Sequence, residues 1–157
     1  MTRLDVTRDE IARWEDISRR MYVPMQDDGI ISQFDGYETL RELDWDDYRT
    51  RYGNIQRLDL ILQAEHDTPN RYKLSKQADV LMLFYVFSAE ELRELFARLG
   101  YPFEYDTIPR NVAYYSARTS HGSPLCRVVH AWVLARSDRP GSMRYFAEAL
   151  QSDVGDI

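Results

Sequence analysis

Hydrogen-bond donors gather directly before a predicted helix, in the segment Arg118-Thr119-Ser120-His121-Gly122-Ser123-Pro124. Ser123 is a favoured N-cap residue and Pro124 is favoured at the first helical position, so we expect the helix to begin here. Its unpaired backbone N–H groups and the positive end of its dipole attract an anion. Hydroxyl, imidazole and guanidinium groups bind phosphate oxygens, and Gly122 allows close approach of the backbone. The segment therefore predicts an anion-binding turn, with simple helix capping as the alternative.

A second candidate lies in the segment Ser75-Lys76-Gln77-Ala78-Asp79-Val80. We expect Ser75 to cap a helix that runs through Phe87, with Lys76 and Gln77 in its first turn. A lysine there faces the positive end of the helix dipole, which is locally unfavourable. A cation in that position indicates a role at the mouth of a pocket, where Lys76 and Gln77 offer donors and an acceptor to sugar hydroxyls. The alternative is a surface lysine whose apolar stem lies along the protein.

The remaining polar residues carry weaker signals. We expect His66 to be solvated, His130 to be packed or at an interface, and Cys126 to be a small packing residue. No group of His, Cys, Asp and Glu has the spacing of metal ligands, and neither a nucleophile elbow nor a P-loop is present. The sequence therefore predicts no metal site and no organic cofactor.

Composition excludes several classes of protein. The chain has 157 residues, of which 44% are hydrophobic and 29% charged, as expected for one globular domain. A net charge of -6 without a cluster of Lys and Arg argues against nucleic-acid binding. The longest apolar run, 80–87, is too short to span a bilayer, and no secretory signal is present. With the single cysteine, Cys126, these features predict a soluble cytoplasmic protein with no membrane partner.

The elements that position the two candidate segments are all predicted to be helical. Capping boxes start one helix after Thr7, running towards Met21, and another after Ser88, which ends at Gly100. Residues 22–54 are less regular and contain at most one or two short helices. Further helices are expected over 57–64, 75–87, 106–117, 123–136 and 142–152. The sequence therefore predicts an all-α protein in which inner helices are wrapped by outer ones.

Apolar patterns predict which helix faces are buried. The uninterrupted apolar run 80–87 predicts burial on nearly all sides of its helix. In the helix after Pro124, one apolar face is predicted from Leu125, Val128, Val129, Trp132 and Ala135. In the last helix, the predicted buried residues are Met143, Phe146, Ala147 and Leu150.

Together, these segments resemble glycoside hydrolase family 65, which includes the maltose, trehalose and kojibiose phosphorylases and some acid trehalases. The resemblance lies in KQADVLMLFYVF, SAEELRELF and YYSARTSHGSPLCRVVHAWVLA, and upstream in IISQFDGY and YGNIQRLDLILQAE. It extends from about Thr7 to the end of the chain. It implies that residues 1–157 are a single segment of a catalytic α/α toroid of six helix pairs, incomplete at both ends.

The resemblance also implies roles for individual residues. Lys76 and Gln77 would contact the glucosyl unit beside the scissile bond. Inorganic phosphate would be bound by a set of loop residues: Ser120, His121, Gly122 and Ser123, with Thr119 and Arg118 close by. The implied reaction is inverting phosphorolysis of an α-linked glucose disaccharide to β-glucose 1-phosphate, with phosphate as co-substrate and no other cofactor.

No residue of this chain is expected to be the catalytic acid. A carboxylic acid must protonate the leaving oxygen, and the family uses a glutamate in a Gly-Pro-Asp-Glu type motif that this chain lacks. We expect that motif upstream of Met1, and we expect the chain alone to be inactive. The sequence also departs from the family at Ser116-Ala117, where Glu-Pro is frequent, and at Pro124 and Cys126, where hydroxyl residues are frequent. We expect these departures to alter the detailed geometry of the phosphate site while the anchoring residues are kept.

Two other functions are compatible with these residues. One is a fragment of a trehalase-type glycoside hydrolase, in which water replaces phosphate. The other is a non-catalytic helical module for binding or assembly. Part of a toroid leaves apolar helix faces uncovered, which favours binding to the remaining part of the enzyme or self-association.

Overall fold

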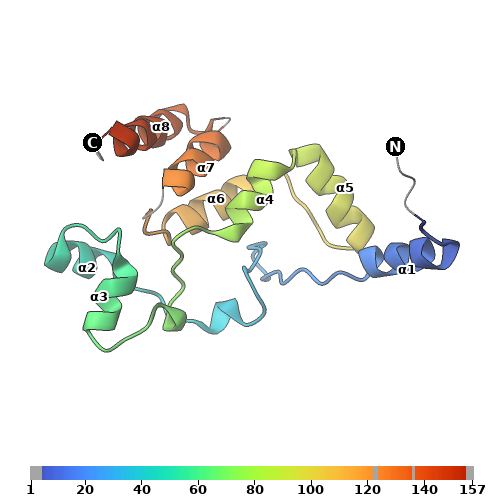
Figure 1. Cartoon of the computed structure of the whole chain (residues 1–157), viewed down its shortest axis with the longest axis horizontal. Coiled ribbons are helices and arrows are strands. Elements are labelled where there is room, and N and C mark those ends of the chain that lie inside the picture. The colour runs from blue at the N-terminus through green and yellow to red at the C-terminus, as the bar shows by residue number, and fades with distance from the viewer. Residues whose placement is uncertain (1–4, 122–123, 136, 155–157) are drawn as a thin grey trace.

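The computed structural model describes residues 5–121, 124–135 and 137–154. Over these residues the regular elements are helices, accompanied only by isolated β-bridges, so the all-α prediction is confirmed (Figure 1). In chain order they are α1 (Arg8–Arg19), the 3₁₀ turn η1 (Tyr37–Thr39), α2 (Trp45–Tyr52), α3 (Leu58–Ala64), the 3₁₀ turn η2 (Pro69–Arg71), α4 (Asp79–Val86), α5 (Ala89–Leu99), α6 (Thr107–Ser116), α7 (Pro124–Leu134) and α8 (Arg139–Val154).

The centre of the molecule is formed by α4, α6 and α7, and α8 packs on α7 (Figure 1). In the figure, α1 lies at one end of the molecule and the α2–α3 pair at the other. The main core includes Leu81 of α4, Leu92 of α5, Tyr115 of α6 and Val129 of α7. This layering is consistent with part of an α/α toroid. No helix in the described part of the chain is both long and apolar enough to cross a membrane.

The irregular stretch before η1 is fixed to α6 by buried hydrogen bonds. The Ile31 amide donates to Asn111 Oδ1 at 2.8 Å, and Asn111 Nδ2 donates to the Gly29 carbonyl at 3.0 Å. Tyr115 donates its hydroxyl proton to the Ile31 carbonyl at 2.5 Å. Ile30 and Ile31 are buried in the main core. The stretch is therefore a structural part of the core, although it has few helical residues.

Both predicted capping boxes are confirmed. Thr7 and Glu10 exchange hydrogen bonds at the start of α1, and Ser88 and Glu91 do so at the start of α5. The α5 helix ends, as predicted, at Gly100, which adopts a φ of 80°. A left-handed backbone of this kind strains any residue with a side chain, so glycine suits this helix end.

The predicted start of α4 is wrong. Ser75 was expected to cap the helix, but α4 begins at Asp79 and its N-cap residue, Ala78, has no side chain that can accept a hydrogen bond. The Asp79 amide is capped instead by Gln33 Oε1 at 3.2 Å. Lys76 and Gln77 therefore lie in an irregular segment before the helix. Burial on nearly all sides is also wrong, because Val86 is 63% exposed.

The predicted buried faces of α7 and α8 are largely wrong. Val129 is buried as expected, whereas Trp132 is 61% exposed and Met143 is 62% exposed. The buried side of α7 carries Cys126 and His130 instead, because that side faces its neighbours α4 and α8. The predicted core residues that are exposed are Leu125, Val128, Ala135, Phe146, Ala147 and Leu150, in addition to Trp132 and Met143. These eight residues are called the outer apolar face below.

A smaller core joins α2 and α3. At its edge, Glu65 connects side chains of α2 through hydrogen bonds. The Glu65 carboxylate accepts hydrogen bonds from Tyr48 and Tyr52, each at 2.6 Å, and from Arg51 at 2.5 Å. These donors hold the carboxylate in its charged form and lower the pKa of Glu65 from 4.5 to about 2, with the Tyr48 hydrogen bond as the largest cause. Leu58 and Leu62 fill the interior beneath them.

We expect the variant Glu65→Gln to be less stable than the native chain at neutral pH and to lose less stability on acidification. The folded pKa lies below that of the unfolded chain, so the contribution of Glu65 is complete above 4.5 and is lost as the pH falls through about 2. Urea unfolding midpoints measured over this range test the prediction. Glu94→Gln, at an exposed position of α5, is the control. If the native chain and Glu65→Gln lost the same stability as the pH fell, the prediction would be contradicted.

Candidate functional site

The two segments singled out in the sequence lie side by side. The Ser75 amide donates to the Arg118 carbonyl at 2.9 Å, and the Ser120 amide donates to the Ser75 carbonyl at 3.0 Å. The two bonds form a parallel bridge between Ser75 and Thr119, which are 44 residues apart in the sequence. Lys76 follows directly after this bridge, and Ser120 and His121 follow it on the other side. The structure thus brings together two groups that the sequence separates.

The end of α6 holds the second segment in place. Thr119 is 2% exposed, and its hydroxyl donates to the Tyr115 carbonyl at 2.7 Å. The Arg118 amide donates to the same carbonyl at 3.0 Å. Because its proton is used within the fold, the Thr119 hydroxyl anchors the loop to the last turn of α6.

Arg118 is engaged with Glu42. Its Nη2 and Nε lie 3.0 and 3.1 Å from the two carboxylate oxygens of Glu42, and its guanidinium carbon lies 3.7 Å from the centre of the Tyr114 ring. Burial opposes ionisation of Glu42, but hydrogen bonds and charges from Arg118 and then Lys73 outweigh it and lower the pKa of Glu42. The guanidinium therefore fixes the loop against the segment before α2.

The polar groups beside the bridge include an ammonium and a hydroxyl. Lys76 is exposed, whereas Gln77 and Ser120 are half-buried. Within the described ranges, no hydrogen bond or ion pair engages the Lys76 ammonium or the Ser120 hydroxyl. The predicted roles of Gly122, and of Ser123 as helix cap, fall outside the described residues. The described part of the site can therefore offer a cation, an amide and a hydroxyl to a polar ligand.

His121 turns its ring towards α7 and α8. Its Nδ1 lies 3.5 Å from Cys126 Sγ, and its Nε2 lies 3.1 Å from the hydroxyl of Tyr145 on α8. The backbone φ of His121 is 52°, which is uncommon for a residue with a side chain. Burial, followed by the neighbouring His130, lowers the pKa of His121 to about 4. The imidazole is therefore neutral near pH 7.

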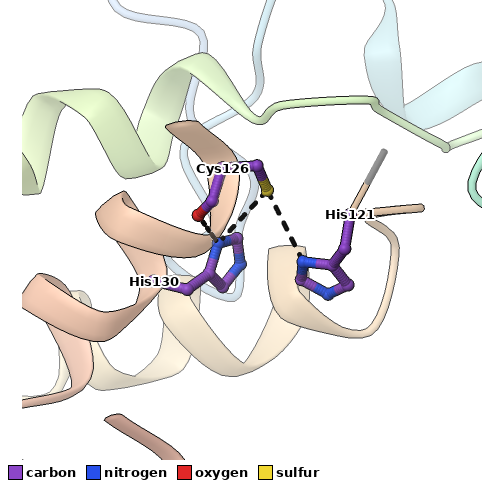
Figure 2. A group of neighbouring side chains, drawn as sticks. All are labelled: His121, Cys126 and His130. Atoms are coloured by element: carbon purple, nitrogen blue, oxygen red, sulfur yellow. Dashed lines mark hydrogen bonds between the residues drawn. The ribbon is translucent and has the colours of Figure 1, made fainter. Parts of the chain in front are cut away.

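Buried Cys126 and His130 form a group with half-buried His121, drawn in Figure 2. The prediction that Cys126 and His130 are packed is confirmed, because they are 0% and 2% exposed. One donor atom from each of the three residues lies within 4.8 Å of the others. This group is not among the sites predicted from the sequence. The four-residue spacing of Cys126 and His130 within one helix was an available signal, but the position of His121 depends on the preceding loop.

His66, the third histidine, is separate from this group. It is exposed, as predicted, and adopts a φ of 60° after the end of α3. It therefore serves as an exposed reference for the half-buried imidazole of His121 and the buried imidazole of His130.

Comparison with known proteins defines the class of the chain. The sequence profile of the glycosyl hydrolase family 65 central catalytic domain matches residues 1–157. The chain belongs to glycosyl hydrolase family 65.

Several relatives are much longer than this chain. An uncharacterized glycosyl hydrolase from Mycobacterium tuberculosis is 59% identical over 99% of this chain, which covers 12% of that relative. Trehalose 6-phosphate phosphorylase from Lactococcus lactis is 31% identical over 98% of this chain, which covers 20% of that relative. Kojibiose phosphorylase from Halothermothrix orenii is 28% identical over 99% of this chain, which covers 18% of that relative.

Proposed function

We propose that this chain forms the sugar- and phosphate-binding part of an inverting α-glucoside phosphorylase. The observation that carries the proposal is the pair of backbone hydrogen bonds joining Ser75 to Arg118 and Ser120. This pairing supports simultaneous binding of a glucosyl unit beside Lys76 and a phosphate beside Ser120. The named phosphorylases among the relatives support the same class of reaction.

In this proposal Lys76 and Gln77 bind the glucosyl unit next to the scissile bond. An ammonium and an amide side chain offer donors and an acceptor to sugar hydroxyls. Lys76 is exposed beside the bridge and can reach a ligand there. The substrate is an α-linked glucose disaccharide, the class suggested by the kojibiose phosphorylase relative.

Phosphate is bound by the loop that follows the bridge. Its ligands are the Ser120 hydroxyl and the groups of Gly122 and Ser123, with the start of α7 adding a favourable field for an anion. Arg118 and Thr119 position the loop through Glu42 and Tyr115. The resemblance to family 65 implies direct contact between His121 and phosphate. In the proposal His121 acts by holding the loop, because both ring nitrogens face groups of α7 and α8.

The proposed reaction transfers the glucosyl unit to phosphate. A phosphate oxygen attacks the anomeric carbon while the bond to the leaving sugar breaks, which inverts the configuration. A carboxylic acid outside this chain protonates the leaving oxygen, and phosphate is the only co-substrate that the chemistry requires. The outer apolar face provides the contact with the remaining part of the enzyme, or with a second copy of the chain.

We expect the chain alone to bind phosphate but to release no glucose 1-phosphate from kojibiose or trehalose. The variant Ser120→Ala should weaken phosphate binding by about 10-fold or more, because a hydrogen bond to a charged group contributes roughly 1.5–3 kcal/mol. Phosphate titrations followed by calorimetry test this, with Ser18→Ala on the distant α1 as the control.

Joining the chain to an upstream family 65 segment that carries the acid should restore phosphate-dependent cleavage. Phosphate-dependent turnover by the 157-residue chain alone would show that a group within it acts as the acid. Cleavage by the joined protein at the same rate without phosphate would favour a hydrolase.

A further inference from the structure

The His130 imidazole is buried and has an unpartnered nitrogen. It is 2% exposed, and its Nδ1 lies 2.8 Å from the Cys126 carbonyl oxygen. A carbonyl only accepts hydrogen bonds, so Nδ1 carries the proton and Nε2 carries a lone pair. That Nε2 has no hydrogen-bond partner among the described residues. Figure 2 shows the Nε2 edge of the ring turned towards His121.

The His121 imidazole is oriented in a complementary way. Its Nε2 lies 3.1 Å from the Tyr145 hydroxyl, and its Nδ1 faces Cys126 Sγ at 3.5 Å. Donation from Nε2 to Tyr145 leaves a lone pair on Nδ1. Histidines that bind a metal usually donate their other ring N–H to an oxygen, which fixes the tautomer and the ring orientation. Both histidines of the group have such an oxygen partner.

From this arrangement we infer that Cys126, His121 and His130 form a binding site for a thiophilic divalent metal ion of the zinc type. The inference goes beyond the proposed function and does not depend on it. Sulfur and imidazole nitrogen are the ligands that such ions prefer.

The distances fit tetrahedral coordination. Zinc binds sulfur at about 2.3 Å and nitrogen at about 2.0–2.1 Å, so neighbouring S and N ligands of a tetrahedral site lie about 3.6 Å apart. Cys126 Sγ lies 3.5 Å from His121 Nδ1. The donor atoms of all three residues lie within 4.8 Å of one another. The His130 nitrogen that lies 3.4 Å from the sulfur is Nδ1, which is hydrogen-bonded to the Cys126 carbonyl, so the His130 ring must turn to direct Nε2 at the ion.

Binding of a divalent ion at this group requires neutral imidazoles and displaces the thiol proton. Burial lowers the pKa of both histidines, which keeps them neutral and able to coordinate. Burial also raises the pKa of the Cys126 thiol to about 11. On binding, the metal–sulfur bond forms, the S–H bond breaks, and the thiol proton passes to solvent.

A metal at this position would connect three parts of the fold. His121 belongs to the loop after α6, Cys126 and His130 belong to α7, and Tyr145 on α8 orients His121. The ion would therefore fix the loop that carries Ser120 against two helices. We assign it a structural role.

The test is a titration of the chelator-treated chain with Co²⁺, followed by competition with Zn²⁺. We expect one equivalent of Co²⁺ to give thiolate-to-cobalt charge-transfer absorption, which Zn²⁺ abolishes. Cys126→Ser should remove this absorption and lower Zn²⁺ affinity by more than about 100-fold. Tyr145→Phe should keep the absorption and lower Zn²⁺ affinity by about 10–100-fold, as for loss of an outer partner of a ligand. His66→Gln, at the exposed histidine, should bind like the native chain.

A second ligand variant, His121→Gln, separates loss of a metal ligand from a folding defect caused by Cys126→Ser. His121 lies on a half-buried loop outside the helices. Zn²⁺ should raise the melting temperature of the native chain and of His66→Gln but not that of His121→Gln. The inference is overturned if the native chain gives no charge-transfer absorption, or if Cys126→Ser and His121→Gln bind Zn²⁺ as tightly as the native chain does.

Discussion

Replacing Ser75 with proline is expected to lower kcat/KM for phosphorolysis by about 100-fold in a chain that also carries the catalytic acid. Proline has no amide proton, so the hydrogen bond from Ser75 to the Arg118 carbonyl is lost. The sugar and phosphate segments then lose one of the two bonds that set their separation. A displacement of about 1 Å between reacting groups is sufficient for a rate effect of this size. Initial rates at varied phosphate and disaccharide concentrations provide the measurement.

Ser75→Ala is the matched control for this prediction. Alanine keeps the backbone amide and carbonyl of the bridge and removes only the hydroxyl, which lies 3.4 Å from Thr119 Oγ1. We expect its kcat/KM to stay within about 3-fold of the native value, since a weak hydroxyl contact contributes about 0.5 kcal/mol. If Ser75→Pro behaved like Ser75→Ala, the backbone pairing would not be what positions the two ligands.

The variant Asn111→Ala should lower the free energy of unfolding by about 3–5 kcal/mol. Asn111 is 0% exposed and hydrogen-bonds the Ile31 amide, the Gly29 carbonyl and the Thr107 carbonyl. Alanine leaves the Ile31 amide and the Gly29 carbonyl without the partner that Asn111 provides, and each buried unsatisfied group costs about 1–3 kcal/mol. Unfolding in urea, followed by circular dichroism, gives the free energy.

Asn70→Ala provides the comparison, because Asn70 is exposed. Surface substitutions of this kind usually change stability by less than about 0.5 kcal/mol. A loss below about 1 kcal/mol for Asn111→Ala would mean that water replaces the side chain in its hydrogen bonds, and that the segment before η1 is not fixed by Asn111.

The features of the fold that the sequence predicts correctly are set by neighbouring residues. Thr7 and Ser88 cap their helices through bonds to residues three positions away, so their roles can be recognised locally. Ser75 resembles them in type, but its backbone pairs with a segment 44 residues distant. The start of α4 could not be predicted for that reason.

Burial on α7 and α8 shows a second limit. Helical periodicity identifies an apolar face but not the neighbour that covers it. Trp132 and Met143 satisfy the apolar pattern, yet the described chain buries the side that carries Cys126 and His130. Which side is covered depends on the packing of α4 and α8 around α7, which no local pattern contains.

The candidate site was predictable in residue type and only partly in geometry. Donor-rich residues before a helix indicated the loop from Arg118 to Ser123. Lys76 was indicated by an expected place in the first turn of α4, which is wrong, because α4 begins at Asp79. The engagement of Arg118 by Glu42 spans 76 residues and has no local signal. The direction of the His121 ring depends on its unusual backbone and on Tyr145 of α8.

The capping of Asp79 by Gln33 has a consequence for how the chain folds. The start signal of α5 lies within a few consecutive residues, so we expect α5 to nucleate early. The start of α4 needs a side chain 46 residues away, and closing a loop of that length has an entropic cost before the contact forms. We therefore expect α4 to become stable late in folding, only after the segment that contains Gln33 has docked.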